Sequence, residues 1–318
     1  MNKQKNNLIF ACGFGWSGSG ALIDFMLDFE KVEIFPGGET FFLKSLLNIL
    51  RKVERNKKID IDKGYHEQVF LGNVPQISNA QVCERIKWVF DNFISQTGIR
   101  AEEYRAVANK TLEAIVNETN ESIINKRVTE YLIYLNNIGR NDNIRIFDNA
   151  IGAVDINLFQ YIDFSFFENI FIYIVDRNPK DRFFELYDIV LSGYQSRSFG
   201  FANTIYKLIK RNKNLTLFLA AVYFTHIYNN KRKQQYKNYL KYLTKQNEKI
   251  TWRQLMFEDI VLKFDQTKNI IQSDFNKILN TSYKDIHHFN PELSKKNIYK
   301  YKEIEDTLAI KYIGKFAK

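Results

Sequence analysis

The chain has 318 residues, of which 45% are hydrophobic, so it is long enough to bury a substantial core. Its 4 prolines and 14 glycines argue against long linkers and low-complexity tracts. Its 2 cysteines imply no disulfide framework, and no metal-ligand spacing is present. The formal charge of +10 favours anionic partners, although a composition rich in Lys, Asn and Ile also produces such a charge through coding bias.

Apolar runs and helical periodicities alternate along the chain. The pattern predicts five strands, at 8–12, 32–35, 144–147, 170–175 and 250–256. In the first half of the chain it predicts helices at 20–29, at 39–55, at 80–96 after an N-cap at Ser78 and at 102–137 with a break near 117–120, with a polar irregular stretch at 57–75. In the second half it predicts a helix at 155–162, a helix from 178, two helices within 204–246, a helix at 265–279 capped by Asp265 and a final helix after a basic loop from 287. This alternation predicts an α/β fold with a central parallel sheet and helices on both faces.

No apolar run approaches the roughly 20 residues that a membrane-spanning helix needs. The N-terminus is basic, but the apolar run 8–12 is too short for the core of a signal peptide. A cytoplasmic protein is therefore the expectation, organised as one domain over 1–318 with a helical insertion at about 40–140.

A glycine-rich loop follows the first predicted strand. Gly13, Gly15, Gly18 and Gly20 fall within eight residues, and a helix is expected to begin near Ser19. Glycine lets backbone N–H groups turn toward one point, and a helix N-terminus adds about half a positive charge there. The loop therefore predicts a phosphate or sulfate site, and a tight strand-to-helix turn without a ligand is the alternative.

The loop departs from the two best-known phosphate-binding motifs. A nucleotide-triphosphate loop has a lysine where this chain has Ser19. Gly13, Gly15 and Gly18 match the dinucleotide spacing, but no well-placed acidic residue follows about 20 residues later.

Polar residues follow four predicted strands. They lie at 13–19, at Gly38 and Glu39, at Asp148 and Asn149, and at Arg177. Because the carboxyl ends of parallel strands meet at one edge of a sheet, the sequence predicts that these positions converge on one cleft.

Several motifs together resemble the sulfotransferases that use 3′-phosphoadenosine 5′-phosphosulfate (PAPS). The run Trp16-Ser17-Gly18-Ser19-Gly20 stands where that family wraps the 5′-phosphosulfate. The run from Tyr173 to Asp181 resembles its 3′-phosphate strand, with Arg177 as the ligand. The acidic pair Glu258-Asp259 and the run 289–298 resemble a later strand end and a cofactor-covering loop of bacterial members.

The resemblance implies a P-loop-like sulfotransferase architecture in which the insertion binds the acceptor. PAPS would be the cofactor and 3′,5′-adenosine bisphosphate (PAP) the product. The implied cofactor-binding residues are Gly15, Trp16, Ser17, Gly18, Ser19, Gly20, Arg177 and Lys296.

Two positions depart from the family pattern. Trp16 replaces the cation that opens the loop, so another cation has to neutralise the departing phosphate. Lys295 or Lys296 is expected to do so, with Lys110 and Arg140 as weaker candidates. Position 185, often a serine that binds the 3′-phosphate, is Glu and would repel phosphate if it pointed inward; either Arg182 compensates or Glu185 faces away.

Sulfuryl transfer needs a base that takes the proton of the acceptor hydroxyl. By analogy with glycan-modifying members, Glu39 stands in the place of that base, and capping of the following helix is the alternative role. His66, His287 and His288 are the other candidates, and Asp148-Asn149 would orient the acceptor.

The expected acceptor is a hydroxyl of a carbohydrate or of a lipid-linked glycan, which would allow peripheral contact with a membrane. No basic motif interleaved with aromatic residues appears, so nucleic acid is not an expected partner. The alternatives are a nucleotide or sugar kinase and a non-catalytic nucleotide-binding protein of the same fold.

Overall fold

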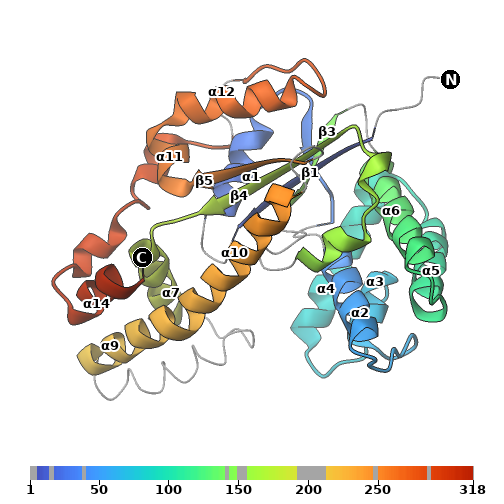
Figure 1. The fold of residues 1–318 in the computed structure, drawn as a ribbon, viewed down its shortest axis with the longest axis horizontal. Coiled ribbons are helices and arrows are strands. Elements are labelled where there is room, and N and C mark those ends of the chain that lie inside the picture. Colours follow the sequence, from blue (N-terminus) through green and yellow to red (C-terminus); the bar gives the residue numbers. More distant parts are fainter. Residues whose placement is uncertain are drawn as a thin grey trace.

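A five-stranded, all-parallel sheet forms the centre of the fold (Figure 1). The computed structural model describes residues 6–13, 18–37, 41–139, 143–148, 156–191, 213–245, 250–284 and 288–317. The strands lie in the order β2 (Val32–Ile34), β3 (Ile144–Asp148), β1 (Asn7–Gly13), β4 (Asn169–Asp176) and β5 (Ile250–Met256). The α/β fold with a parallel sheet, expected from the alternation of apolar runs and helices, is confirmed.

The central strands β1 and β4 owe their position to continuous apolar runs. Residues 8–12 of β1 and 170–175 of β4 are all buried. A strand that is apolar on both faces is stable only where helices cover both faces, as in a parallel sheet. The two strands pair along their whole length, from Asn7 beside Asn169 to Gly13 beside Val175.

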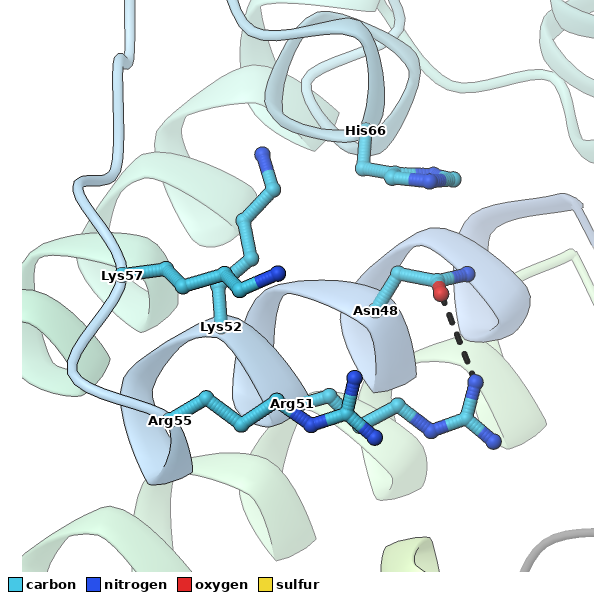
Figure 2. A pocket seen from close by; sticks show the side chains of 6 residues that line it. All are labelled: Asn48, Arg51, Lys52, Arg55, Lys57 and His66. Carbon is cyan, nitrogen blue, oxygen red and sulfur yellow. Dashed lines mark hydrogen bonds between the residues drawn. The ribbon is translucent and has the colours of Figure 1, made fainter.

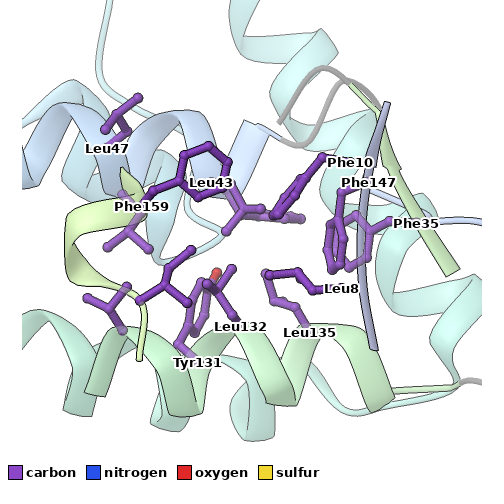
Figure 3. Packing of buried hydrophobic residues seen from close by; sticks show 14 of the residues in the cluster. Leu8, Phe10, Phe35, Leu43, Leu47, Tyr131, Leu132, Leu135, Phe147 and Phe159 are labelled. Atoms are coloured by element: carbon purple, nitrogen blue, oxygen red, sulfur yellow. The ribbon is translucent and has the colours of Figure 1, made fainter. Parts of the chain in front are cut away.

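Helices cover the two faces unequally. One face carries α1 (Ser19–Leu27), α11 (Phe257–Leu262) and α12 (Phe264–Phe275), which pack on Ile9, Ala11, Phe171 and Tyr173. The opposite face carries a thicker layer, made of α2 (Phe41–Glu54), α3 (Tyr65–Phe70), α4 (Ala80–Thr97), α5 (Ala101–Asn117), α6 (Glu121–Asn137), the 3-10 helix η1 (Ile156–Tyr161) and α10 (Asn230–Lys245). Figure 3 shows Leu43 of α2 and Leu132 and Leu135 of α6 turned toward Leu8 and Phe10 of β1.

A third apolar cluster lies beside the sheet. It joins α7 (Pro179–Leu191), α9 (Lys213–Tyr223), the π-helical turn η4 (Phe224–Asn229) and α14 (Leu308–Phe316). Between α12 and α14 lie the short helices α13 (Pro291–Lys295) and η5 (Lys300–Ile304). Among the described helices, none combines the length and the apolar character needed to cross a membrane.

Three local predictions were wrong. The stretch 57–75 contains α3, a six-residue helix that is too short to show a period and depends on packing of Val69 and Phe70. The N-cap of α4 is Asn79, whose side chain accepts from the backbone N–H of Val82, so Ser78 lies one residue too early. The N-cap of α12 is Lys263, and Asp265 lies in the first turn, where it pairs with Lys268.

The break in the long helical region 102–137 is confirmed, because α5 ends at Asn117 and the side chain of Asn120 caps α6. The predicted helix 155–162 is the 3-10 helix η1. The predicted separation near 211–214 falls partly outside the described residues.

The buried carboxylate of Asp274 makes the sheet's outer edge sensitive to pH. Its oxygens accept hydrogen bonds from Arg253 of β5 at 2.8 and 2.9 Å, from Lys277 at 3.1 Å and from the Tyr173 hydroxyl at 3.3 Å. Burial by itself would raise the pKa of Asp274, but the hydrogen bonds from Arg253 and Lys277 outweigh it and hold the pKa below its ordinary value.

We therefore expect Asp274→Asn to lower the free energy of unfolding by about 2–3 kcal/mol at pH 7. A carboxylate with a depressed folded-state pKa stabilises the fold above its unfolded pKa of about 3.9. The difference between wild type and variant should thus stay constant from pH 7 to 5 and shrink as the pH falls below about 4. Urea unfolding at several pH values measures it, and a difference that persisted undiminished at pH 2 would contradict this role.

Candidate functional site

The two central strands send the chain to opposite faces of the sheet. After β1 the chain enters α1 on one face, whereas after β4 it returns to β5 through α10, whose Leu243 packs on the other face. The carboxyl ends of β1 and β4 therefore form the point at which the crossovers change face. In parallel α/β sheets, ligands bind in the crevice at such a point.

The N-terminus of α1 lies at this point. Gly18 precedes the helix with φ +90°, a left-handed conformation that favours glycine, and no described side chain caps the helix. Gly20 is exposed, and a Cβ built on it would meet nothing within 4 Å. The helix start thus presents backbone N–H groups beside open space, as an anion site needs. Of the predicted loop residues, Gly15, Trp16 and Ser17 lie outside the described part of the chain.

Arg177 lies at the end of β4, and its side chain is only 4% exposed. The guanidinium pairs with the Glu185 carboxylate on α7 and donates to the backbone carbonyl of Asn297. Its Nε atom is buried and has no hydrogen-bond partner among the described residues. A buried guanidinium with an unused donor is suited to an additional acceptor, such as a phosphate oxygen.

The ring of Phe257 lies between the helix start and the arginine. The Arg177 guanidinium carbon lies 4.9 Å from the ring centroid. A Cβ on Gly18 would lie 2.9 Å from Cγ of the same ring and closer still to Cδ2. The structure therefore brings Gly18 and Arg177, which are far apart in the sequence, to one aromatic side chain at the carboxyl edge of the sheet.

The ion pairs after β4 show which way the side chains of Glu185 and Arg182 point. Glu185 turns its carboxylate toward Arg177 and pairs with it, although 38% of its side chain stays exposed. Arg182 pairs with Asp176 at 3.2 Å and donates to Asn229 at 2.9 Å. The expectation that Glu185 faces away is therefore wrong. The Glu185 carboxylate is thus one acceptor on the Arg177 guanidinium, where an anionic ligand would compete with it.

The segment with Lys295 and Lys296 lies next to Arg177 through the carbonyl of Asn297. Both lysines are exposed, and Lys295 pairs with Glu292 one turn earlier in α13. The buried carboxylate of Asp181 accepts from the backbone N–H groups of Tyr299 and Tyr301 at 3.0 and 3.4 Å, which fixes the segment to α7. Lys295 and Lys296 therefore lie in the segment that contacts Arg177 through Asn297, and among the described residues neither lysine contacts the arginine itself.

The other candidates are distributed differently. Glu39, Asn149 and His287 lie outside the described residues. Asp148 is the last residue of β3 and lies beside Ala11 of β1 in register. His66 lies on α3 in a separate basic pocket, and the backbone N–H of His288 donates to the carboxylate of Asp28, the residue that follows α1.

Phe257 and the half-buried carboxylate of Glu258 complete the site. Glu258 accepts from the backbone N–H of Asn178 at 3.0 Å, which ties the start of α11 to the residue after Arg177. Burial raises the pKa of Glu258. Phe257 was not singled out from the sequence as a site residue. The residue directly follows β5, so its place at the end of a predicted strand was the sequence feature that could have pointed to it.

Within the described residues, no group of three or more His, Cys, Asp or Glu side chains could hold a metal ion. A scan against protein-family models, a search of curated proteins and a search of solved structures each found no match to the chain.

Proposed function

We propose that the chain is a PAPS-dependent sulfotransferase that transfers a sulfuryl group to a hydroxyl of a carbohydrate or lipid-linked glycan. The observation that carries the proposal is the pair formed by the α1 N-terminus and the buried Arg177 on the two sides of Phe257. This arrangement suits a nucleotide with negative charge at two separate positions. It agrees with the sequence resemblance of the loop and of the run after β4.

The N-terminus of α1 and Arg177 would each bind one of the two charged ends of the cofactor. The first N–H groups of α1 and the Ser19 hydroxyl would hold the 5′ phosphosulfate, together with Ser17 of the preceding loop. Arg177 would hold the 3′-phosphate through its forked guanidinium. Binding would exchange the Glu185 carboxylate for phosphate, because both are acceptors for the same donors.

PAPS would supply the sulfuryl group, and the residues of the chain would supply positioning and charge. As the acceptor oxygen bonds to sulfur and the sulfur–oxygen bond to the phosphate breaks, Glu39 would take the hydroxyl proton. Lys295 or Lys296, from the segment beside Arg177, would neutralise the charge that develops on the leaving phosphate.

Calorimetric titration with PAP, with ATP–magnesium as the comparison, tests the cofactor assignment. We expect PAP to bind and Arg177→Ala to weaken its binding by about a hundredfold or more, because a charge-assisted bidentate contact is lost. Arg127→Ala, which removes a half-exposed arginine on α6, is the matched control and should leave PAP affinity unchanged.

The same titration separates the alternatives. Glu185→Gln should tighten PAP binding, since it removes the carboxylate that competes for Arg177. Binding of ATP–magnesium alone would contradict the proposal and favour a kinase. PAP binding without sulfuryl transfer to any hydroxyl acceptor would favour a non-catalytic nucleotide-binding protein.

A further inference from the structure

A basic pocket of about 250 Å³ lies between the C-terminal half of α2 and the helix α3 (Figure 2). Its lining residues are Asn48, Arg51, Lys52, Arg55, Lys57 and His66. Four of them are cationic side chains, and no carboxylate lines the pocket. Figure 2 shows the imidazole of His66 extending over α2 on the side of Asn48.

The end of α2 and the turn after it bring these cationic side chains together. Arg51 lies in the last turn of α2 and Arg55 directly follows the helix, where its backbone N–H still donates to the carbonyl of Arg51 at 3.3 Å, so both side chains start from the same side. Asn56 then adopts a left-handed conformation with φ +50°, and the backbone N–H of Lys57 donates to the carbonyl of Lys52 at 2.8 Å. This turn reverses the chain and brings Lys57 back to the pocket instead of letting it continue away from α2.

Acids beside the pocket neutralise only part of the charge of its lining. The Lys52 ammonium pairs at 2.6 Å with Glu67, a carboxylate of α3 that is fully buried. Glu54, the other acid of this turn of α2, accepts instead from Gln160 and Tyr161. Arg51 donates to the side-chain oxygen of Asn48 at 3.4 Å.

Arg55 and Lys57 are exposed and form no ion pair with a described residue. The cations therefore repel one another across the pocket. Burial lowers the pKa of Arg51, and the neighbouring Arg55 lowers it further, while Glu54 opposes this lowering. Burial also lowers the pKa of His66, with additional lowering by Lys52 and Arg51 that Glu67 opposes. A bound anion would relieve this repulsion.

We propose that this pocket binds the phosphate or sulfate ester group of a small soluble molecule. At roughly 30 Å³ for each water, its volume corresponds to about eight waters, so it has room for such a group and a small part of the molecule that carries it. Arg51 and Arg55 supply planar donors that fit tetrahedral oxyanions, and Lys57 supplies a point charge.

This site is separate from the candidate nucleotide site. The candidate nucleotide site is built from Gly18, Phe257 and Arg177 at the carboxyl ends of β1, β4 and β5, and none of these residues lines the pocket. The pocket is built instead from the end of α2, the turn after it and α3. The proposal therefore does not depend on the assignment of PAPS, and each can fail without the other.

Titration of the full chain with pyrophosphate, at fixed ionic strength, tests the site by calorimetry and by the NMR signals of the His66 ring. We expect binding to raise the pKa of His66, because a nearby anion favours the imidazolium. The double variant Arg55→Gln/Lys57→Gln should weaken pyrophosphate binding by about tenfold for each lost charge-assisted contact. Lys87→Gln, at an exposed position of α4, removes a charge elsewhere and should change nothing.

The arms of the experiment distinguish the sources of the anion. Pyrophosphate binding that survives the double variant but is lost in Arg177→Ala would overturn the proposal, because it would belong to the other site. Binding to vesicles that contain phosphatidic acid, lost in the double variant and without any response to pyrophosphate, would likewise overturn it in favour of a lipid surface. The double variant and Lys87→Gln change exposed side chains, and melting temperatures equal to that of the wild type would establish that they fold.

Discussion

Replacement of Gly18 by alanine is expected to lower the free energy of unfolding by about 3 kcal/mol. Its φ of +90° is disfavoured for any residue with a Cβ. The added methyl group would also overlap the ring of Phe257, which is buried and cannot move aside without disturbing the core behind it. Because Arg177 packs on the same ring, PAP affinity should fall together with stability.

Gly20→Ala is the matched control for this prediction. Gly20 lies in the first turn of the same helix, and a Cβ there would meet open space. Its stability should stay the same or rise by up to about 1 kcal/mol, because alanine favours the helix. Urea unfolding of both variants measures the difference, and equal losses at the two positions would contradict the role given to Gly18.

Loss of the Asp28 carboxylate is expected to cost about 3–5 kcal/mol, because several donors lose their acceptor and each buried donor left unpaired costs about 1–3 kcal/mol. Asp28 is 1% exposed at the end of α1. Its oxygens accept from the backbone N–H groups of His288 and Phe289 at 2.8 and 3.0 Å and from the Tyr283 hydroxyl at 3.2 Å. Asp28→Ala would leave these donors without their acceptor.

Thermal or urea unfolding measures the loss in free energy of unfolding, and amide hydrogen exchange shows which residues lose protection. In Asp28→Ala, exchange should accelerate at residues 288–289, before α13. Asp24→Ala, one turn earlier on the exposed side of α1, should stay within about 0.5 kcal/mol of wild type. Unchanged protection at 288–289 would show that Asp28 does not hold this segment.

The elements of the sheet could be predicted from the sequence, whereas the order of its strands could not. Runs such as 170–175 are apolar throughout, and only a strand covered on both faces accommodates them. The insertion of β3 between β2 and β1 depends instead on how the helical layer packs, which no local pattern records. Short α3 was missed for the same reason, since its buried Glu67 is stabilised by Lys52 of another helix.

The candidate site was predictable where it follows strand ends. The glycine-rich loop that contains Gly18 follows one apolar run and Arg177 follows another, so their meeting at one edge agrees with the parallel sheet. Phe257 between them, and the inward direction of Glu185, depend on tertiary contacts across α11 and α7. The basic pocket was not predicted, because Arg51 and Arg55 have the spacing of any solvated face of an amphipathic helix.

The position of β1 at the middle of the sheet has a consequence for synthesis on the ribosome. This apolar strand is made first, but its neighbours begin only at residues 144 and 169. At about 5–20 residues per second, on the order of 10 s pass before β4 emerges. During that time β1 keeps two open edges, while the helices α2–α6 can already form from local contacts. We therefore expect substitutions that make β1 more prone to aggregate to reduce the yield of folded protein more than they reduce the stability of the molecules that do fold.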